Sequence, residues 1–403
     1  MFVSIWSTVF LVAQAVAPAT TSNASQLFPS EVKWTVEVSA KPVGAPVSSG
    51  DRLFVPLESG VSARRLADGG ELWNAKVEIA GALAASPDRV MVPGKTELRA
   101  LVASTGEVAW TLPTSGLTAP PVVYGDLLFV AMGEELTAMK VADGTKAWSQ
   151  NVGLVEERPV VDGTRMYVPA SDGRLIALML ESGVAIWEFD VGIKPTEPLI
   201  FQDRVYVGSA AKRFCSIEAR NGQEVWCFAI GAGIVGKAAA DESHVYFVAL
   251  DNLLRAHDRR NGARKWKVDL KYRPSSGPSL VGHTVSAPGA STRILQAFET
   301  TTGSPGSQLA LADELVQVPV FVTSDERPTT LAAVSGNLKN VWKLTLAVQP
   351  PPPPPKLRVA PVTVLPGQVV PRGSLQVPRG LSSRGVEPLP RFARVTAPKT
   401  TGG

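Results

Sequence analysis

Short apolar runs alternate with polar, glycine-containing turns along most of this chain. Examples are PVVYG and DLLFVAM within residues 121–132, and PLIFQ and DRVYVGS within residues 198–209. Short β-rich runs that are bounded by turn residues predict strands. Residues 31–346 contain no apolar stripe of useful length with the 3.6-residue period of a helix. We therefore expect an all-β fold.

A glycine followed four residues later by a tryptophan recurs at six places in the chain. The pairs are Gly69 and Trp73, Gly106 and Trp110, Gly144 and Trp148, Gly183 and Trp187, Gly222 and Trp226, and Gly262 and Trp266. The residue before each glycine is Asp, Asn, Ser or Thr, all of which can hydrogen-bond their own backbone in a turn. Glycine supplies the positive φ that such a turn requires. Each motif therefore predicts a β-hairpin whose second strand carries the tryptophan.

These hairpins recur with a period near 39 residues. Intervals of 37 to 40 residues separate Trp34, Trp73, Trp110, Trp148, Trp187, Trp226 and Trp266. A fixed period of this length indicates a repeat architecture. Two further apolar runs precede each hairpin, so each unit has four short strands, which is typical of a β-propeller blade.

The two ends of the repeat region decide the number of blades. Seven units are followed by three strand candidates at residues 316–322, 329–335 and 340–346, and a single strand at 31–38 precedes them. We predict that this N-terminal strand, which carries Trp34, is the outer strand of the last blade. It would close an eight-bladed ring and remove free sheet edges. Gln308 is expected at the outer-strand position of unit seven, and a seven-bladed ring is the alternative.

The repeated pattern x-[DNST]-G-x-x-x-W resembles the pyrroloquinoline quinone (PQQ)-like repeat over about residues 31–346. This repeat occurs in eight-bladed quinoprotein dehydrogenases and in the non-catalytic outer-membrane assembly propeller BamB, which the chain resembles more. The resemblance implies that each indole packs between adjacent blades, so the tryptophans are structural and leave the function open.

No residues can be assigned to catalysis, to a cofactor or to a metal. The resemblance to quinoprotein dehydrogenases would imply adjacent cysteines, a calcium or lanthanide site and an Asp base, yet the chain has no adjacent cysteine pair and no long insertions. His244, His257 and His283 lack metal-ligand spacing. The neighbours Glu156 and Glu157 are expected to be solvated, because two carboxylates form an acid–base pair only where a third group separates their pKa values.

The two cysteines predict a disulfide within one hairpin. If Arg220-Asn221-Gly222 forms the loop, Cys215 lies opposite Cys227, and Glu218 lies opposite Glu224. Directly opposed residues have Cβ atoms about 4.5–5.5 Å apart, which is close to disulfide distance. Two buried free thiols are the alternative.

Four segments are expected along the chain. Residues 1–19 resemble a secretory signal peptide, with an apolar run and small residues at A-x-A spacing but no Lys or Arg. Residues 20–30 form a linker, and residues 31–348 form the propeller. Residues 349–403 form a disordered Pro-rich tail with eight basic residues and one acid. No segment is expected to span a membrane, because the apolar run is too short.

Together these patterns predict an exported, periplasmic or outer-membrane-associated protein that is monomeric, is not an enzyme and has no cofactor. It would bind a protein partner in the cell envelope, with outer-membrane protein assembly as the role that the resemblance implies. The basic tail could also contact an anionic surface. Nucleic acid is not expected, because the basic residues lack interleaved aromatic groups. The alternatives are a PQQ-dependent oxidoreductase or relict quinone-cofactor binder, and a surface protein whose tail does the binding.

Overall fold

The computed structural model describes residues 30–289, 294–310, 320–324, 327–334 and 340–346. All of them belong to the first of two compact units, Met1–Pro350, whereas the second unit, Pro351–Gly403, lies outside the described residues. The expected signal peptide (1–19), the linker up to residue 29 and the tail (349–403) also lie outside them. Within the described ranges the regular structure is entirely β, and no helix there is long and apolar enough to cross a membrane.

The first four sheets of the chain each contain four consecutive strands. Blade 1 contains β2 (Val47–Ser49), β3 (Arg52–Leu57), β4 (Gly60–Arg65) and β5 (Glu71–Ala75). Blade 2 contains β6 (Ala84–Ala85), β7 (Arg89–Pro93), β8 (Glu97–Val102) and β9 (Val108–Pro113). Blade 3 contains β10 (Val122–Tyr124), β11 (Leu127–Met132), β12 (Glu135–Lys140) and β13 (Lys146–Asn151). Blade 4 contains β14 (Val160–Asp162), β15 (Arg165–Pro169), β16 (Arg174–Met179) and β17 (Ala185–Asp190).

The remaining sheets continue this order until the last one. Blade 5 contains β18 (Leu199–Phe201), β19 (Arg204–Gly208), β20 (Arg213–Glu218) and β21 (Glu224–Ala229). Blade 6 contains β22 (Ile234–Ala240), β23 (His244–Ala249), β24 (Leu253–Asp258) and β25 (Arg264–Asp269). Blade 7 contains β26 (Ser279–Val281), β27 (Thr284–Ser286), β28 (Ile294–Glu299) and β29 (Pro305–Ala310). Blade 8 contains β30 (Val320–Ser324), β31 (Arg327–Val334), β32 (Asn340–Leu346) and β1 (Ser30–Glu37).

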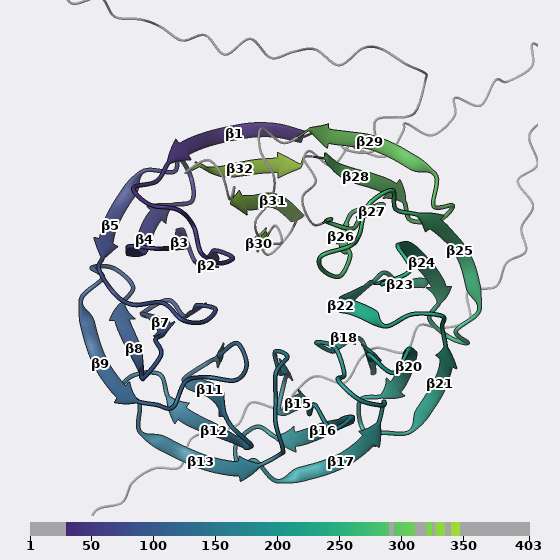
Figure 1. Ribbon diagram of the computed structural model, residues 1–403, viewed down its shortest axis with the longest axis horizontal. Coiled ribbons are helices and arrows are strands. Elements are labelled where there is room, and N and C mark those ends of the chain that lie inside the picture. Colours follow the sequence, from purple (N-terminus) through teal and green to yellow (C-terminus); the bar gives the residue numbers. More distant parts are fainter. Residues whose placement is uncertain (1–29, 290–293, 311–319, 325–326, 335–339, 347–403) are drawn as a thin grey trace, which may run out of the picture. The chain divides into compact units, whose positions relative to one another are not determined.

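The N-terminal strand closes the ring, as the sequence predicts. Strand β1 pairs antiparallel with β32, from Ser30 opposite Leu346 to Glu37 opposite Asn340. Figure 1 shows β1 at the circumference of blade 8, in line with the outer strands β5, β9, β13, β17, β21, β25 and β29 of the other blades. The predicted all-β, eight-bladed propeller is therefore confirmed, and the seven-bladed alternative is wrong.

Burial follows from the position of each strand in its blade. The second and third strands are packed between two neighbouring blades, and their side chains are buried on both faces, as in β15 and β16. The outer strand β17 alternates, and Trp187 is its one buried residue. Apolar runs therefore become the middle strands, and alternating polar runs become the rim.

Each outer-strand indole contacts the hairpin of the following blade. The indole N–H groups donate hydrogen bonds of 2.9–3.1 Å to the carbonyl oxygens of Leu66, Ala103, Val141, Leu180, Ala219, Arg259 and Thr300, in the order Trp34 to Trp266. The glycines of these hairpins have φ between 71° and 79°. A β-carbon on any of them would lie 2.5–3.1 Å from the preceding blade's indole. The motif glycine is therefore required for two reasons. Its turn needs a positive φ, and the indole of the preceding blade leaves no room for a β-carbon.

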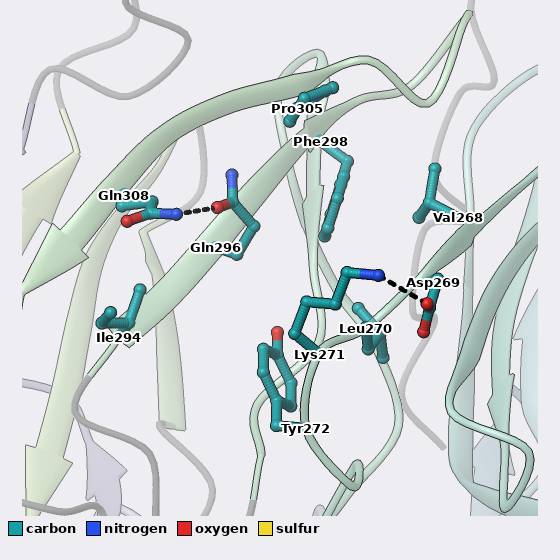
Figure 2. A pocket seen from close by; sticks show the side chains of 10 residues that line it. All are labelled: Val268, Asp269, Leu270, Lys271, Tyr272, Ile294, Gln296, Phe298, Pro305 and Gln308. Carbon is teal, nitrogen blue, oxygen red and sulfur yellow. Dashed lines mark hydrogen bonds and ion pairs between the residues drawn. The ribbon is translucent and has the colours of Figure 1, made fainter. Parts of the chain in front are cut away.

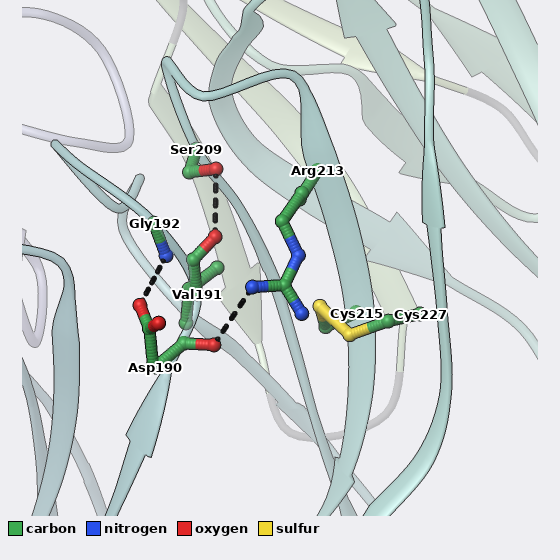
Figure 3. Close-up of a disulfide and its surroundings, with 7 residues drawn as sticks. All are labelled: Asp190, Val191, Gly192, Ser209, Arg213, Cys215 and Cys227. Atoms are coloured by element: carbon green, nitrogen blue, oxygen red, sulfur yellow. Dashed lines mark hydrogen bonds between the residues drawn. A yellow bond between two sulfur atoms is a disulfide. The ribbon is translucent and has the colours of Figure 1, made fainter.

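The cysteine pair forms the predicted disulfide, while one predicted pairing beside it is wrong. Cys215 of β20 is bonded to Cys227 of β21, and the two residues are directly opposed. Glu224 lies opposite Ile217 and not opposite Glu218, because a β-bulge shifts the register by one residue between Ser216 and Ile217. Figure 3 shows that Arg213, beside the disulfide, donates to the carbonyl oxygen of Asp190 in blade 4 at 3.1 Å.

Gln308 lies one residue beyond the indole position. In blade 6, Trp266 is opposite Ala256 and Lys267 is opposite Arg255. In blade 7, Gln308 is opposite Gln296, which is the rung that corresponds to Lys267 and Arg255. The expected place of Gln308 is therefore corrected by one residue. The reason is the distance from the turn, since Gln308 follows Gly303 by five residues and each tryptophan follows its glycine by four.

Candidate functional site

One face of the ring carries the loops that connect consecutive blades. Because the strands of a blade alternate in direction, these loops emerge on the same face as the turns between the second and third strands. We call it the connection face, and the opposite face the hairpin face. Three apolar side chains at loop tips of blades 4, 5 and 6 are exposed on the connection face: Leu154 (41%), Ile193 (60%) and Leu250 (47%).

Backbone hydrogen bonds hold these tips in place. The N–H of Ser171, in the β15–β16 turn, donates to the carbonyl of Leu154 at 2.7 Å, and its carbonyl accepts from Lys194, the neighbour of Ile193, at 3.1 Å. The N–H of Leu250 donates to the carbonyl of Gly233 at 2.9 Å. The apolar tips are therefore presented on fixed loops.

Five charged residues of the same blades form a cluster on this face: Glu156, Glu157, Lys194, Glu197 and Lys237. Glu156 pairs with Lys194 at 3.3 Å, and Glu197 pairs with Lys237 at 3.2 Å. Glu157 has no ion-pair partner among the described residues. We refer to these residues as the charged cluster.

The environment separates the pKa values of the neighbours Glu156 and Glu157. Hydrogen bonds from Ser171, at 2.9 Å, and from Lys194 lower the pKa of Glu156. Burial, followed by repulsion from Glu197 and Glu156, raises the pKa of Glu157, although this residue keeps exposed surface. Both side chains are exposed, as expected from the sequence, but their pKa values are shifted in opposite directions. Burial is the main cause of the shift at Glu157, and Glu197, which lies on a different loop, adds to it.

The histidines do not come together. His257 is buried, stacks on Phe228 with ring centroids 4.6 Å apart, and bonds the carbonyl of Gly262 through Nδ1 at 2.8 Å. His244 lies 3.5 Å from Asp241, and His283 is exposed in a turn. In the part of the chain that the structure describes, no three His, Cys, Asp or Glu side chains are placed to hold a metal ion.

A pocket lies between blades 6 and 7, away from the charged cluster. Its volume is about 650 Å³, and it is lined by the end of β25, the loop after it, β28 and β29 (Figure 2). Tyr272 closes one side and donates to the carbonyl of Ala287 at 2.7 Å. Burial raises the pKa of Tyr272 to about 12. Most of the surface that lines the pocket is apolar.

Sequence reasoning missed both the charged cluster and the pocket. The tryptophans that it singled out lie on outer strands between blades, apart from the charged cluster. A comparison of equivalent positions in the repeats could have indicated both features. Glu157 and Glu197 stand in consecutive blade-to-blade loops, and Val268 replaces a phenylalanine that follows the tryptophan by two residues in blades 4 and 5.

A closed ring of four-stranded sheets, docked by indoles at this spacing, defines the class as a PQQ-like repeat β-propeller. The family model described as outer membrane protein assembly factor BamB matches residues 57–198 and 190–314, which is more than half of the chain. The chain belongs to this family. No curated protein sequence matches it.

Solved structures share the fold at low sequence identity. BamB from Moraxella catarrhalis superimposes with a TM-score of 0.67 at 19% identity, covering 78% of this chain and 99% of that one. The quinohemoprotein alcohol dehydrogenase from Comamonas testosteroni gives 0.65 at 13% identity, covering 80% and 77%. The computationally designed Ika8 protein gives 0.62 at 12% identity, covering 77% and 98%. Catalytic and non-catalytic propellers are both similar, so these likenesses describe the fold alone.

Proposed function

We propose that this protein is an exported, monomeric, non-catalytic scaffold that binds a protein partner in the cell envelope and supports outer-membrane protein assembly. The observation that carries the proposal is the connection face of blades 4–6, where exposed apolar tips accompany the charged cluster. Membership of the family described as outer membrane protein assembly factor BamB supports the role in assembly. The disulfide supports export, because disulfides persist in oxidising compartments.

The composition of this face suits protein recognition. Protein interfaces have an apolar centre with few charges and a polar rim. Ile193 and Leu250 supply exposed apolar anchors on loops that the rigid ring holds in place. Glu157 supplies a carboxylate without a partner within the described residues, which a basic group of a partner can pair.

A photo-crosslinking amino acid at Ile193 tests this proposal. Val184 is a matched control, because it is equally exposed (58%) and lies on the hairpin face of blade 4. In the native envelope we expect a discrete protein adduct from position 193 and none from position 184. Equal adducts from both positions, or none from 193, would contradict the assignment of the face.

The non-catalytic part of the proposal has its own test. PQQ with Ca²⁺ is added to the purified protein, and thermal unfolding is followed. We expect no change in the midpoint. A saturable rise would favour the quinone-cofactor alternative.

We further propose that the basic tail, residues 349–403, adds contact with an anionic surface. Its eight basic residues and single acid support this. Vesicles with and without anionic lipid test it with the full chain and a chain lacking 349–403. Selective binding of the full chain to anionic vesicles is expected, and equal binding by both chains would contradict the proposal.

A further inference from the structure

The pocket between blades 6 and 7 occupies the place that an aromatic ring takes in the neighbouring interface. Between blades 5 and 6, Phe228 follows Trp226 by two residues, and its ring stacks on His257 of the next blade with centroids 4.6 Å apart. Between blades 6 and 7, Val268 has the position of Phe228, and Phe298 has the position of His257. A valine side chain is smaller than a benzyl group, so space is left in front of Phe298.

The walls of this space are mainly apolar. Leu270 and Phe298 are buried, and Tyr272 is half-buried with its hydroxyl bonded to Ala287. The two charges at the rim, Asp269 and Lys271, pair with each other at 2.7 Å and present no net charge. Pockets of about 300–1,000 Å³ with apolar walls are typical small-molecule sites. The cavity of about 650 Å³ falls in this range.

One wall offers hydrogen bonds. The side-chain nitrogen of Gln296 donates to the carbonyls of Ala297 and Gly306, and Gln308 donates to the side-chain oxygen of Gln296 at 2.6 Å. Figure 2 shows this pair on the side of the pocket opposite Val268. The second N–H and the oxygen of the Gln308 amide have no partner among the described residues. They can accept from or donate to a ligand.

We propose that this pocket binds a small, uncharged aromatic molecule with one hydrogen-bonding group. Its ring would lie between Val268 and Phe298, as the Phe228 ring lies against His257, and its polar group would bond the amide of Gln308. A charged ligand is disfavoured, because Asp269 and Lys271 neutralise each other and the walls offer no other charge.

Fluorine NMR with 5-fluoroindole as the probe tests the site in the full chain. We expect saturable binding to the wild type, and binding about tenfold or more weaker in Val268→Phe, which fills the space. Leu112→Phe places a phenylalanine at the equivalent position of blade 2 and is expected to leave binding unchanged. Gln308→Ala should weaken binding several-fold, and indole-3-carboxylate should compete poorly.

Clear outcomes would overturn the proposal. They are an absence of saturable binding to the wild type, undiminished binding to Val268→Phe, or an equal loss in Leu112→Phe. If Val268→Phe does not fold, Val268→Leu replaces it, and a smaller but definite loss of affinity is expected. Failure here would leave the protein-binding proposal intact, because that proposal rests on Leu154, Ile193, Leu250 and the charged cluster, none of which lines this pocket.

Discussion

One residue pair, an indole of one blade and a glycine of the next, forms a contact that recurs between neighbouring blades. Trp187 donates to the carbonyl of Ala219 and packs on Gly222, whose added β-carbon would lie 2.7 Å from the ring. Sequence reasoning explains this glycine by its turn alone. The structure adds a steric reason that a single hairpin cannot reveal, because the indole comes from the previous blade.

Two alanine substitutions separate the effect of backbone strain in the turn from the effect of the steric contact with the indole. Gly163 has φ of 58° and nothing within 4 Å of an added β-carbon, whereas Gly222 has φ of 76° and the indole of Trp187 in contact. Gly163→Ala should cost about 1–2 kcal/mol of unfolding free energy from backbone strain alone. Gly222→Ala should cost about 1–3 kcal/mol more from overpacking. Urea unfolding measures both, and equal losses would contradict the steric role.

His257 makes stability depend on pH at the interface of blades 5 and 6. Burial is the main cause that lowers its pKa from 6.5, with help from Arg255 and Arg264. Below about pH 6.5 the imidazole of the unfolded chain takes up a proton that the buried imidazole does not. The unfolding free energy therefore decreases as the pH falls below that value. His257→Phe, which copies Phe298 of blade 7, should reduce the loss of unfolding free energy between neutral and mildly acidic pH.

His283→Gln is the control for this measurement, because His283 is exposed in a turn. The change that His257→Phe makes to the pH profile of unfolding free energy is compared with the change that His283→Gln makes. An unchanged profile in His257→Phe would exclude His257 as the source of the acid sensitivity.

At the scale of the element, the opposed residue pair next to the indole position links the outer strand to the third strand in several blades. Blade 3 uses a hydroxyl contact of 3.0 Å between Thr137 and Ser149, and blade 5 uses the disulfide. Blade 7 uses the amide pair of Gln296 and Gln308. The outer strand has a strand neighbour on one side only, so a cross-strand link here stabilises the edge that is otherwise weakest.

Removal of the disulfide measures the strength of one such link. Cys215→Ala with Cys227→Ala should lower the unfolding free energy by at most about 3 kcal/mol, because the closed loop is short. Reductant should lower the stability of the wild type in the same direction and leave the double variant unchanged. Thr137→Ala with Ser149→Ala is the control, with a loss of about 1 kcal/mol that reductant does not alter. A wild type that is insensitive to reductant would contradict a structural role for the disulfide.

Local sequence patterns were enough to predict the strands and hairpins, but they do not predict contacts between different repeats. The spacing of Cys215 and Cys227 within one hairpin is enough to predict the disulfide, but the bulge that moves Glu224 opposite Ile217 is set by backbone geometry. The raised pKa of Glu157 depends on burial and then on Glu197, which comes from the next blade-to-blade loop. The pocket depends on Val268 facing Phe298 across an interface. These features require the register of whole blades.

At the scale of the whole molecule, the first described strand completes the last sheet. The tryptophan period and the unpartnered strand around Trp34 were enough to predict this closure, and Trp34 then docks on blade 1 as the other indoles dock on theirs. A closed ring has no unpaired end blade, so the loops of blades 4–6 are held on a continuous support. The proposed binding face depends on this closure.

Disulfide trapping between β1 and β32 tests the closure most directly. Glu37 lies opposite Asn340, so Glu37→Cys with Asn340→Cys should form a cross-link under oxidising conditions, identified by peptide mass spectrometry. Glu37→Cys with Ser324→Cys, on the innermost strand of the same sheet, should form none. A cross-link only in the first variant is the result that an eight-bladed ring closed by its N-terminal strand predicts. No cross-link there, or equal cross-linking in both, would contradict it.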